Sequence, residues 1–523
     1  MEPHSIAVDR TSATATITFA DPFNVAVPFI DRHVQEGRGA KAAIVGDFGE
    51  VTYAELAERV DQAGTALQSL GGSPGARVLL LLQDGPEFFY LFWGAIKAGF
   101  IPVPLNTLLR AADYRFIIED SQCSCVLYSE RFRDELLAAL PEVDTPPPVM
   151  LPYEGDTGFA AAMARATPAL EAAPAHAESP CFWLYSSGST GRPKGVVHAH
   201  KDIPVTCVHY ATGVLGLGAA DICYSVAKLF FAYGLGNAMT FPLWVGATAV
   251  LSSDRPTPAL SADLIERYRP TCFFGVPTLY AAQLRDLGPE RDLSSVRTYV
   301  SAGEALPADI LRRWKERTGC VILDGIGSTE ILHIFISNTP SDYRPGSSGR
   351  VVPGYDAKVL DADGTEAAPG TPGALWIRGA SVTPGYWNDP ERTQRCIRDG
   401  WIDTGDTYVR DADGWFMYCG RNDDMLKVGG IWCSPFEIEA ALVEHPDVLE
   451  AAVVGREDQD GLVKPEAFVV TMSAEIPLER LAGELRERCK STLAPYKYPR
   501  WINFVPDLPK TATGKIQRFR LRP

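Results

Sequence analysis

Short apolar runs of strand length alternate with helical patterns along the first 350 residues of the chain. One apolar run covers 78–82, the apolar helical stretch FFYLFWGAIKAG follows at 88–99, and the run IPVPL comes directly after it. A helix is expected to start at VTYAEL (51–56), with Thr52 as its cap. The repeated order of strand, helix and strand predicts parallel sheets that are flanked by helices.

The alternation is interrupted once and then resumes at about residue 181. Residues 141–180 are rich in Pro and Ala with little periodicity, so they predict a long surface connection. Further apolar runs follow, several of which end in Gly or Ser; they are CFWLY (181–185), ATAVLSS (247–253), TCFFGV (271–276), TYVSAG (298–303) and CVILDGIG (320–327). The carboxyl ends of strands are where ligands bind in sheets of this kind.

The pattern changes twice more toward the C-terminus. From about residue 350, Asp-Gly turns separate short strands, which predicts an antiparallel region. The last hundred residues contain a capped amphipathic helix at 434–445, two strand patterns and a second helix, which predicts a small α+β unit. The polar, turn-rich stretch GRNDD (420–424) is the expected linker.

Composition and charge narrow the classes of function. The 523 residues carry a formal net charge of -16, which disfavours nucleic acid and anionic membranes as partners. No apolar run reaches the length of a membrane span, and MEPHSIAVDR at the N-terminus lacks the pattern of a secretory signal. Eleven cysteines occur without a CxxC pair, so we expect neither disulfides nor structural zinc, and a reducing cytoplasm.

One stretch carries the chemistry of a phosphate site. YSSGSTGRPKG (185–195) combines three glycines with four Ser or Thr hydroxyls and two cations. Glycines allow a tight turn with its N–H groups directed inward, and hydroxyls and cations add further donors for an anion. The spacing matches neither a Walker loop nor a dinucleotide-binding fingerprint, so the stretch predicts another kind of nucleotide-binding loop.

Seven stretches in order resemble the motifs of the adenylate-forming superfamily, whose members include acyl-CoA synthetases, peptide-synthetase adenylation domains and luciferases. They are YSSGSTGRPKGVVHAH (185–200), SAGEALP (301–307), DGIGSTE (324–330), GALWIRG (373–379), GWIDTGD (400–406), GRNDDMLKVGG (420–430) and PKTATGK (509–515). Together they cover most of the chain. The resemblance implies a reaction in which a carboxylate attacks the α-phosphate of ATP and a thiol, usually of CoA, then displaces AMP.

The resemblance also assigns roles around the nucleotide. The β- and γ-phosphates would be held by Ser186, Ser187, Gly188, Ser189, Thr190 and Lys194. Thr329 would contact phosphate and Glu330 would hold Mg²⁺, which prefers hard oxygen ligands. Asp406 would accept hydrogen bonds from the ribose, with Arg421 beside it. The adenine wall would comprise Ser301, Ala302, Gly303, Glu304, Asp324, Gly325, Ile326 and Gly327.

The family is known to rotate its small C-terminal domain between the two half-reactions. By resemblance, Lys515 bridges the acid and the α-phosphate during adenylation, which makes it catalytic together with Thr190 and Glu330. Asp423 has the hinge position, and Gly429 and Gly430 would border the CoA tunnel. The fold expected is therefore an α/β N-terminal domain with an antiparallel region (1–421), a hinge (422–424) and a mobile α+β C-terminal domain (425–523).

The expected acid is a small aromatic carboxylate. KLFFAYGLGN (228–237) and GSTEILHIF (327–335) resemble the branch of benzoate-CoA and hydroxybenzoate-CoA ligases. Phe231 stands where many relatives have a His, and no acidic residue offers a partner for an amino acid's ammonium group. The resemblance implies a ring pocket of Phe231, Ala232, Tyr233, Gly327, His333 and Ile334.

Several alternatives stay open at this point. Tyr233 and His333 could both bond a ring hydroxyl, so benzoate and a hydroxybenzoate are equally compatible. The acceptor thiol could belong to a carrier protein instead of CoA, and a nucleotide-sensing protein without catalysis is the third class. Lys515, Glu330 and Asp406 argue against that third class because a sensor does not need all three. A homodimer is also left open.

Overall fold

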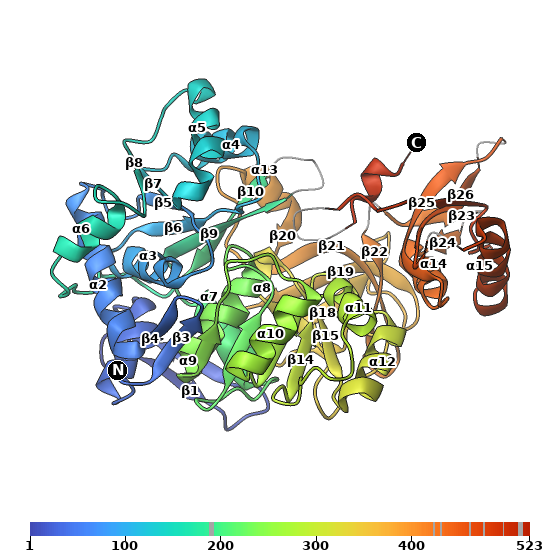
Figure 1. Ribbon diagram of the computed structural model, residues 1–523, viewed down its shortest axis with the longest axis horizontal. Coiled ribbons are helices and arrows are strands. Elements are labelled where there is room, and N and C mark those ends of the chain that lie inside the picture. Colours follow the sequence, from blue (N-terminus) through green and yellow to red (C-terminus); the bar gives the residue numbers. More distant parts are fainter. Residues whose placement is uncertain are drawn as a thin grey trace.

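The computed structural model describes residues 1–187, 193–421, 424–428, 431–459, 462–473, 476–494, 496–510 and 516–522. Figure 1 shows a large N-terminal part, coloured blue to light orange, and a smaller C-terminal unit in darker orange and red on the right. Among the described residues, the strands form separate parallel and antiparallel sheets with helices packed around them. The architecture confirms the α/β fold class and its α+β C-terminal unit.

A four-stranded parallel sheet lies in the N-terminal part. Its order is β6 (Ile101–Pro104), β5 (Arg77–Leu81), β7 (Cys125–Tyr128) and β8 (Val149–Pro152). The helices α2 (Tyr53–Ser69) and α3 (Pro86–Lys97) pack against each other beside it. Helix α2 starts where the sequence predicted, because the Thr52 hydroxyl accepts from the Glu55 N–H and the Glu55 carboxylate accepts from the Thr52 N–H.

The expectation for residues 141–180 is wrong. This stretch contains strand β8 and helix α6 (Phe159–Arg165), which packs against α2. Phe159 is fully buried and Met163 is 2% exposed. Two buried side chains on a short Ala-rich helix are enough to attach it to the core, although they produce almost no visible period in the sequence.

A nine-stranded mixed sheet forms the centre of the N-terminal part. Its order is β17 (Arg350–Val351), β16 (Ile334–Ser337), β15 (Ile322–Gly327), β14 (Thr298–Ser301), β13 (Cys272–Gly275), β11 (Ile222–Ser225), β12 (Thr248–Val250), β3 (Ala42–Gly46) and β4 (Gly49–Thr52). The central strands run parallel, and antiparallel strands close both edges. Parallel strands of this sheet therefore end together at one edge, as predicted.

An antiparallel sheet follows, as the Asp-Gly turns predicted. It contains β18 (Tyr355–Leu360), β19 (Pro372–Gly379), β21 (Trp401–Arg410), β20 (Ile397–Arg398) and β22 (Phe416–Arg421). The turn glycines Gly364 and Gly414 have φ of 79° and 83°, a conformation that L side chains rarely adopt. The Gly364 turn lies between the paired strands β18 and β19, and the Gly414 turn lies between the paired strands β21 and β22.

The C-terminal unit has its own core. Strands β25 (Val448–Glu457), β26 (Val463–Thr471) and β27 (Trp501–Phe504) form one sheet, and β23 (Leu426–Val428) pairs with β24 (Ile431–Cys433). Helices α14 (Pro435–Val443) and α15 (Leu478–Thr492) pack in the same core. It contains Ile438 and Leu442 of α14, Leu485 of α15 and Val453 of β25. Ser434 caps α14 by accepting from the Glu437 N–H, as the sequence indicated.

The other elements connect these layers. They are β1 (Ile6–Asp9), β2 (Thr16–Phe19), α1 (Arg32–Gln35), α4 (Ala111–Ser121), α5 (Arg133–Ala139), β9 (Pro180–Ser187), β10 (Pro193–Ala199), α7 (Asp202–Thr206), α8 (Ala232–Leu235), α9 (Phe241–Val245), α10 (Pro258–Tyr268), α11 (Pro277–Asp286), α12 (Ala308–Thr318) and α13 (Pro390–Cys396). Short 3₁₀ or π turns lie at Val27–Asp31, Glu130–Phe132, Leu140–Glu142, Cys207–Thr212, Gly236–Thr240, Thr329–Ile331 and Arg518–Arg520. No described helix is both long and apolar enough to cross a membrane.

Candidate active site

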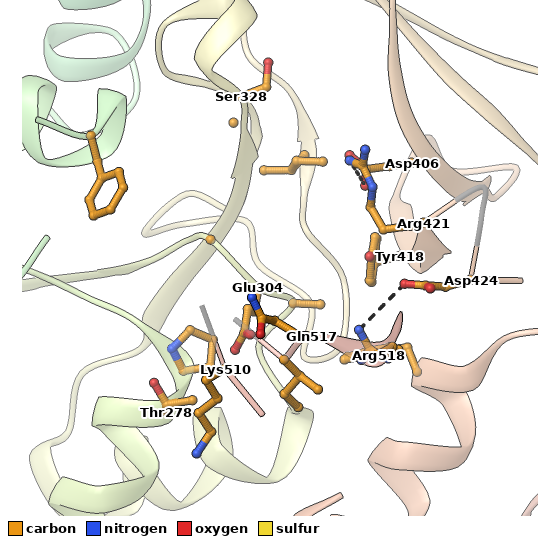
Figure 2. Close-up of a pocket in the computed structure, with 18 of the residues that line it drawn as sticks. Thr278, Glu304, Ser328, Asp406, Tyr418, Arg421, Asp424, Lys510, Gln517 and Arg518 are labelled. Carbon is orange, nitrogen blue, oxygen red and sulfur yellow. Dashed lines mark hydrogen bonds and ion pairs between the residues drawn. The ribbon is translucent and has the colours of Figure 1, made fainter. Parts of the chain in front are cut away.

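A cavity of ≈ 1000 Å³ opens between the N-terminal part and the C-terminal unit. Its walls include the ends of β9, β10, β15 and β21 from the first part and residues of α14, β25 and 516–518 from the second. Figure 2 shows Glu304 and Asp406 from the first part, and Lys510, Gln517 and Arg518 from the second, around this space. The cavity is of the size that small-molecule sites have.

The antiparallel pair β9 and β10 carries the predicted phosphate loop. Ser186 and Lys194 are register partners at its open end, and both line the cavity. The Ser186 hydroxyl is buried with no hydrogen-bond partner among the described residues, which suits a site built for an absent ligand. Gly188, Ser189 and Thr190 lie outside the described residues, as does the side chain of Ser187.

The base of this strand pair is held firmly. The Tyr185 hydroxyl donates to Asp120 Oδ2 at 2.5 Å, and the Trp387 indole N–H donates to the Asp120 carbonyl oxygen at 2.8 Å. Trp387 also stacks near Trp183, with ring centroids 4.3 Å apart. These contacts hold the described strands on either side of residues 188–192.

Lys194 and Glu330 form an ion pair inside the cavity. Lys194 Nζ lies 2.6 Å from Glu330 Oε1, and the two side chains are only 21% and 14% exposed. The Tyr386 hydroxyl donates to the same oxygen at 3.1 Å. Burial opposes ionisation of Glu330, but Lys194 and Tyr386 outweigh it and lower the pKa of the carboxyl. Glu330 is therefore a carboxylate at neutral pH, beside Thr329, which also lines the cavity.

These oxygen donors fit a magnesium ion. No group of three His, Cys, Asp or Glu side chains that could hold a metal occurs across the part of the chain that the structure describes. Magnesium does not need such a group, because it usually takes one or two carboxylates and completes its shell with water and substrate phosphates. The ionised Glu330, with the Thr329 hydroxyl next to it, matches this requirement.

Asp406 and Arg421 come together on neighbouring strands. They are register partners of β21 and β22, and Arg421 Nη1 lies 3.0 Å from Asp406 Oδ1. Arg421 also donates to the Thr404 carbonyl oxygen at 3.2 Å. Both side chains line the cavity next to Tyr418, as Figure 2 shows.

The predicted adenine wall divides into two sets. Gly303, Glu304, Gly325, Ile326 and Gly327 line the cavity, whereas Ser301, Ala302 and Asp324 do not. Ser301 and Asp324 are register partners of β14 and β15, and both are buried in the sheet. Burial raises the pKa of Asp324 well above its usual range. Position along the strands explains this division, because Gly303 and Glu304 follow the end of β14 and residues 325–327 form the end of β15, whereas Ser301 and Asp324 still pair with each other inside the sheet.

The predicted ring pocket divides in the same way. Phe231, Ala232 and Gly327 line the cavity, and Tyr233, His333 and Ile334 lie outside its lining. Of this second set, His333 and Ile334 are 3% and 1% exposed. A Cβ at Gly327 would lie 2.7 Å from the His333 carbonyl oxygen, so glycine permits the close approach of β15 and the backbone of His333.

His333 sits in an aromatic cage. Its ring centroid lies 4.4 Å from that of Phe241, 5.3 Å from Tyr210 and 5.7 Å from Tyr233. The Nε2 atom is 3.1 Å from Asn237 Oδ1, while Nδ1 is buried with no partner among the described residues. Burial lowers the pKa of His333 to about 3, so the ring is neutral.

The C-terminal unit presents the segment that flanks Lys515. Lys515 itself lies outside the described residues, as do Asp423, Gly429 and Gly430. On either side of it, Lys510 and Ile516 form an isolated antiparallel bridge and both line the cavity. Arg518 follows, with Nη2 2.6 Å from Glu439 Oε2 of α14. The described residues on both sides of 511–515 therefore lie at the cavity.

Tyr386 is a residue of the site that no motif in the sequence indicated. It stands in an irregular stretch, TPGYWNDP, whose only signals are turn residues. Its contact with Lys194 and Glu330 arises because three segments far apart in the chain meet, at 193–199, 329–331 and 383–387. This contact depends on tertiary packing, so no spacing of residues in the sequence predicts it.

The family of the chain follows from comparison with known proteins. Residues 30–387 match the AMP-binding enzyme family and residues 437–515 match the AMP-binding enzyme C-terminal domain. The chain therefore belongs to the AMP-binding enzymes.

Particular relatives cover nearly all of it. The chain is 47% identical to a benzoate–CoA ligase of Thauera aromatica, over 98% of each chain. It is 44% identical to a 4-hydroxybenzoate–CoA/benzoate–CoA ligase of Rhodopseudomonas palustris, over 96% of this chain and 94% of the relative. Among solved structures, the anthranilate CoA ligase AuaEII in complex with anthranoyl-AMP gives a TM-score of 0.93 at 41% identity, covering 96% of this chain and 97% of that one. A benzoate CoA ligase from Burkholderia xenovorans LB400 gives 0.89 at 43%, covering 96% and 100%.

Proposed function

We propose that the chain is an AMP-forming aryl-CoA ligase, with benzoate or a hydroxybenzoate as its acid. The observation that carries this proposal is the single cavity in which Lys194, Glu330 and Asp406 line the same space as Phe231 and Ala232. Lys194, Glu330 and Asp406 have the chemistry of a nucleoside triphosphate site. Phe231 and Ala232 offer an apolar wall. The relatives at 47% and 44% identity are named as ligases of benzoate and 4-hydroxybenzoate, which supports an aromatic acid.

In the first half-reaction, a carboxylate oxygen of the acid attacks the α-phosphorus of ATP and pyrophosphate leaves. Both reactants are anions, so the protein must neutralise charge and hold the attacking and leaving oxygens in line. We assign Lys194 and the loop 186–190 to the β- and γ-phosphates, and Lys515 to the acid and the α-phosphate. A lysine suits the bridging position because it is a compact point charge.

Asp406 and Arg421 would fix the nucleoside. The carboxylate would accept from the ribose hydroxyls, and Arg421, 3.0 Å away, holds that carboxylate in its orientation. Gly303, Glu304, Gly325 and Ile326 would surround the base. Mg²⁺, held by Glu330 with Thr329 nearby, would neutralise phosphate charge when bound.

In the second half-reaction, the thiol of CoA attacks the acyl carbon of the adenylate and AMP leaves. We propose that the C-terminal domain (425–523) turns about the hinge 422–424 relative to residues 1–421, which withdraws Lys515. Gly429 and Gly430 would then border the path of the pantetheine arm, where a side chain would obstruct the thiol.

For the acid, we propose a ring bound against Phe231 and Ala232, with Gly327 as the opposite wall. Tyr233, His333 and Ile334 would support this pocket from behind its lining. The neutral His333 ring has one N–H donor and one acceptor nitrogen and no positive charge. A ring hydroxyl could approach the unpartnered Nδ1 if the cage relaxes on binding.

The test is a product analysis. The purified chain is incubated with benzoate, ATP, Mg²⁺ and CoA, and AMP and benzoyl-CoA are separated by chromatography. We expect equal amounts of both, without any carrier protein. A second arm replaces CoA with labelled pyrophosphate and measures the label that the reverse of adenylation transfers into ATP. Absence of AMP release with benzoate and with hydroxybenzoates would overturn the proposal.

A further inference from the structure

The ion pair of Lys194 and Glu330 has a third member. Lys194 Nζ lies 3.4 Å from the Tyr386 hydroxyl oxygen and 4.7 Å from the centroid of its ring. The same hydroxyl donates to Glu330 Oε1 at 3.1 Å. One tyrosine therefore contacts the cation through its ring and the anion through its hydroxyl, in the space assigned to the ATP phosphates.

The backbone around Tyr386 is built to hold it there. The segment 383–387 runs along β10, where the Trp387 N–H donates to the Gly195 carbonyl oxygen at 2.8 Å. At its start, the Thr383 N–H donates to the Glu330 carbonyl oxygen at 2.8 Å. The Tyr386 N–H itself donates to Thr393 Oγ1 at 3.0 Å. The segment of Tyr386 is thus tied to β10, to the turn Thr329–Ile331 and to α13, and Tyr386 is 7% exposed.

The hydroxyl is a dependable donor in this place. Its partner is a carboxylate oxygen, which can only accept, so the tyrosine O–H is the donor of this hydrogen bond. Lys194 and Tyr386 both contact Oε1 of Glu330, which leaves Oε2 as the oxygen that can face a metal ion.

The proposed function assigns Lys194 to the ATP phosphates, so bound phosphate would draw its ammonium away from Glu330 and weaken their ion pair. Glu330 would then lose its cationic partner inside a buried site, which is costly for a carboxylate. We propose that Tyr386 is a positioning residue of the nucleotide site, which retains Oε1 of Glu330 when Lys194 moves to phosphate and so presents Oε2 to magnesium. This inference rests on the proposed function of the same site.

The test measures equilibrium binding of ATP by titration calorimetry, without acid or CoA, once in Mg²⁺ and once in EDTA. Tyr386→Phe keeps the ring but removes the hydroxyl. We expect it to reduce the gain in ATP affinity that Mg²⁺ provides by roughly tenfold, the effect of losing a hydrogen bond to a charged group. Affinity in EDTA should change by less than about twofold. Tyr53→Phe is the matched control, since Tyr53 is also buried and donates to the Ala247 carbonyl oxygen at 2.6 Å, far from the cavity lining.

A double-mutant cycle isolates the coupling. Glu330→Gln should remove most of the magnesium-dependent gain, and adding Tyr386→Phe to it should change nothing further. Thermal melting of each variant confirms that it is folded. An equal loss of affinity in Mg²⁺ and in EDTA, or full additivity with Glu330→Gln, would overturn the role of Tyr386. If the wild-type chain binds no ATP, the proposed function fails and this inference fails with it. If the wild-type chain binds ATP and forms the aryl-CoA, the proposed function holds, and the double-mutant cycle alone tests the role of Tyr386.

Discussion

Asp406 and Arg421 face each other across β21 and β22, and Arg421 Nη1 lies 3.0 Å from Asp406 Oδ1. The two residues are fifteen positions apart in the chain, and one hairpin brings them to the same wall of the cavity. The same sheet contains a second pair of this kind, Asp356 and Arg378, with Nη2 and Oδ2 2.7 Å apart. That second pair is more than half exposed, so it offers a direct comparison.

Asp406→Asn should lower kcat/KM for ATP by about 10- to 100-fold, because a neutral amide accepts more weakly from the ribose than a carboxylate does. The loss should appear mainly as a higher KM for ATP, with KM for the acid little changed. Asp356→Asn is the control and should leave both constants at wild-type values, since exposed ion pairs contribute little. A wild-type KM for ATP in Asp406→Asn would show that the ribose is bound elsewhere.

Lys515→Ala should cripple adenylation and spare thioester formation. The reason is that, in the proposed mechanism, the lysine neutralises charge only while the acid attacks the α-phosphate. The measurement supplies the variant with preformed benzoyl-adenylate and CoA and compares the rate of benzoyl-CoA release with that of the overall reaction. If both rates fall equally, the lysine serves both half-reactions or supports the fold.

Asp423→Pro should show the opposite pattern, with adenylate formed and benzoyl-CoA lost. Proline fixes φ near −65°, and domain rotation requires a large change in backbone angle at the pivot. Pyrophosphate exchange reports the first step and thioester release the second. Equal loss of the two activities would place the pivot at another residue.

Acid should destabilise the folded chain partly through His333. Burial lowers its pKa from 6.5 to about 3, so between these values the unfolded chain binds a proton that the folded chain does not. The free energy of unfolding should therefore fall by about 1.4 kcal/mol for each pH unit below 6.5 on account of this one residue. His333→Gln should flatten the decline of thermal midpoint between pH 6 and pH 5. The exposed His176 is the control, and an unchanged slope in His333→Gln would contradict the assignment.

Much of the fold follows from local pattern. Thr52, Ser434 and the Asp-Gly turns act on their own neighbours, so their effects on α2, α14 and the antiparallel sheet can be predicted from the sequence. The helix α6 could not be predicted, because Phe159 and Met163 are its only buried side chains. Its place depends on the surface that α2 presents.

The site shows the same division between local and tertiary information. Motif resemblance predicted that Lys194, Glu330, Asp406 and Arg421 surround one nucleotide. All four line the same cavity in the structure. The resemblance could not tell that Ser301 and Asp324 point into the sheet, since that depends on strand register. It also gave no sign of Tyr386, which reaches Glu330 only through the packing of 383–387 on β10.

The most direct test of the central claim is a comparison of kcat/KM for benzoate, 4-hydroxybenzoate, cyclohexanecarboxylate and octanoate on one preparation. A flat ring fits between Phe231 and Gly327 with little loss of conformational freedom, whereas a flexible chain must fix several torsions. Each methylene in an apolar pocket changes discrimination by roughly 1–3 kcal/mol, so several together give at least about a hundredfold. We expect kcat/KM for at least one of the two aromatic acids to exceed kcat/KM for octanoate by that factor. Octanoate equal to or better than both would contradict the aryl-CoA ligase.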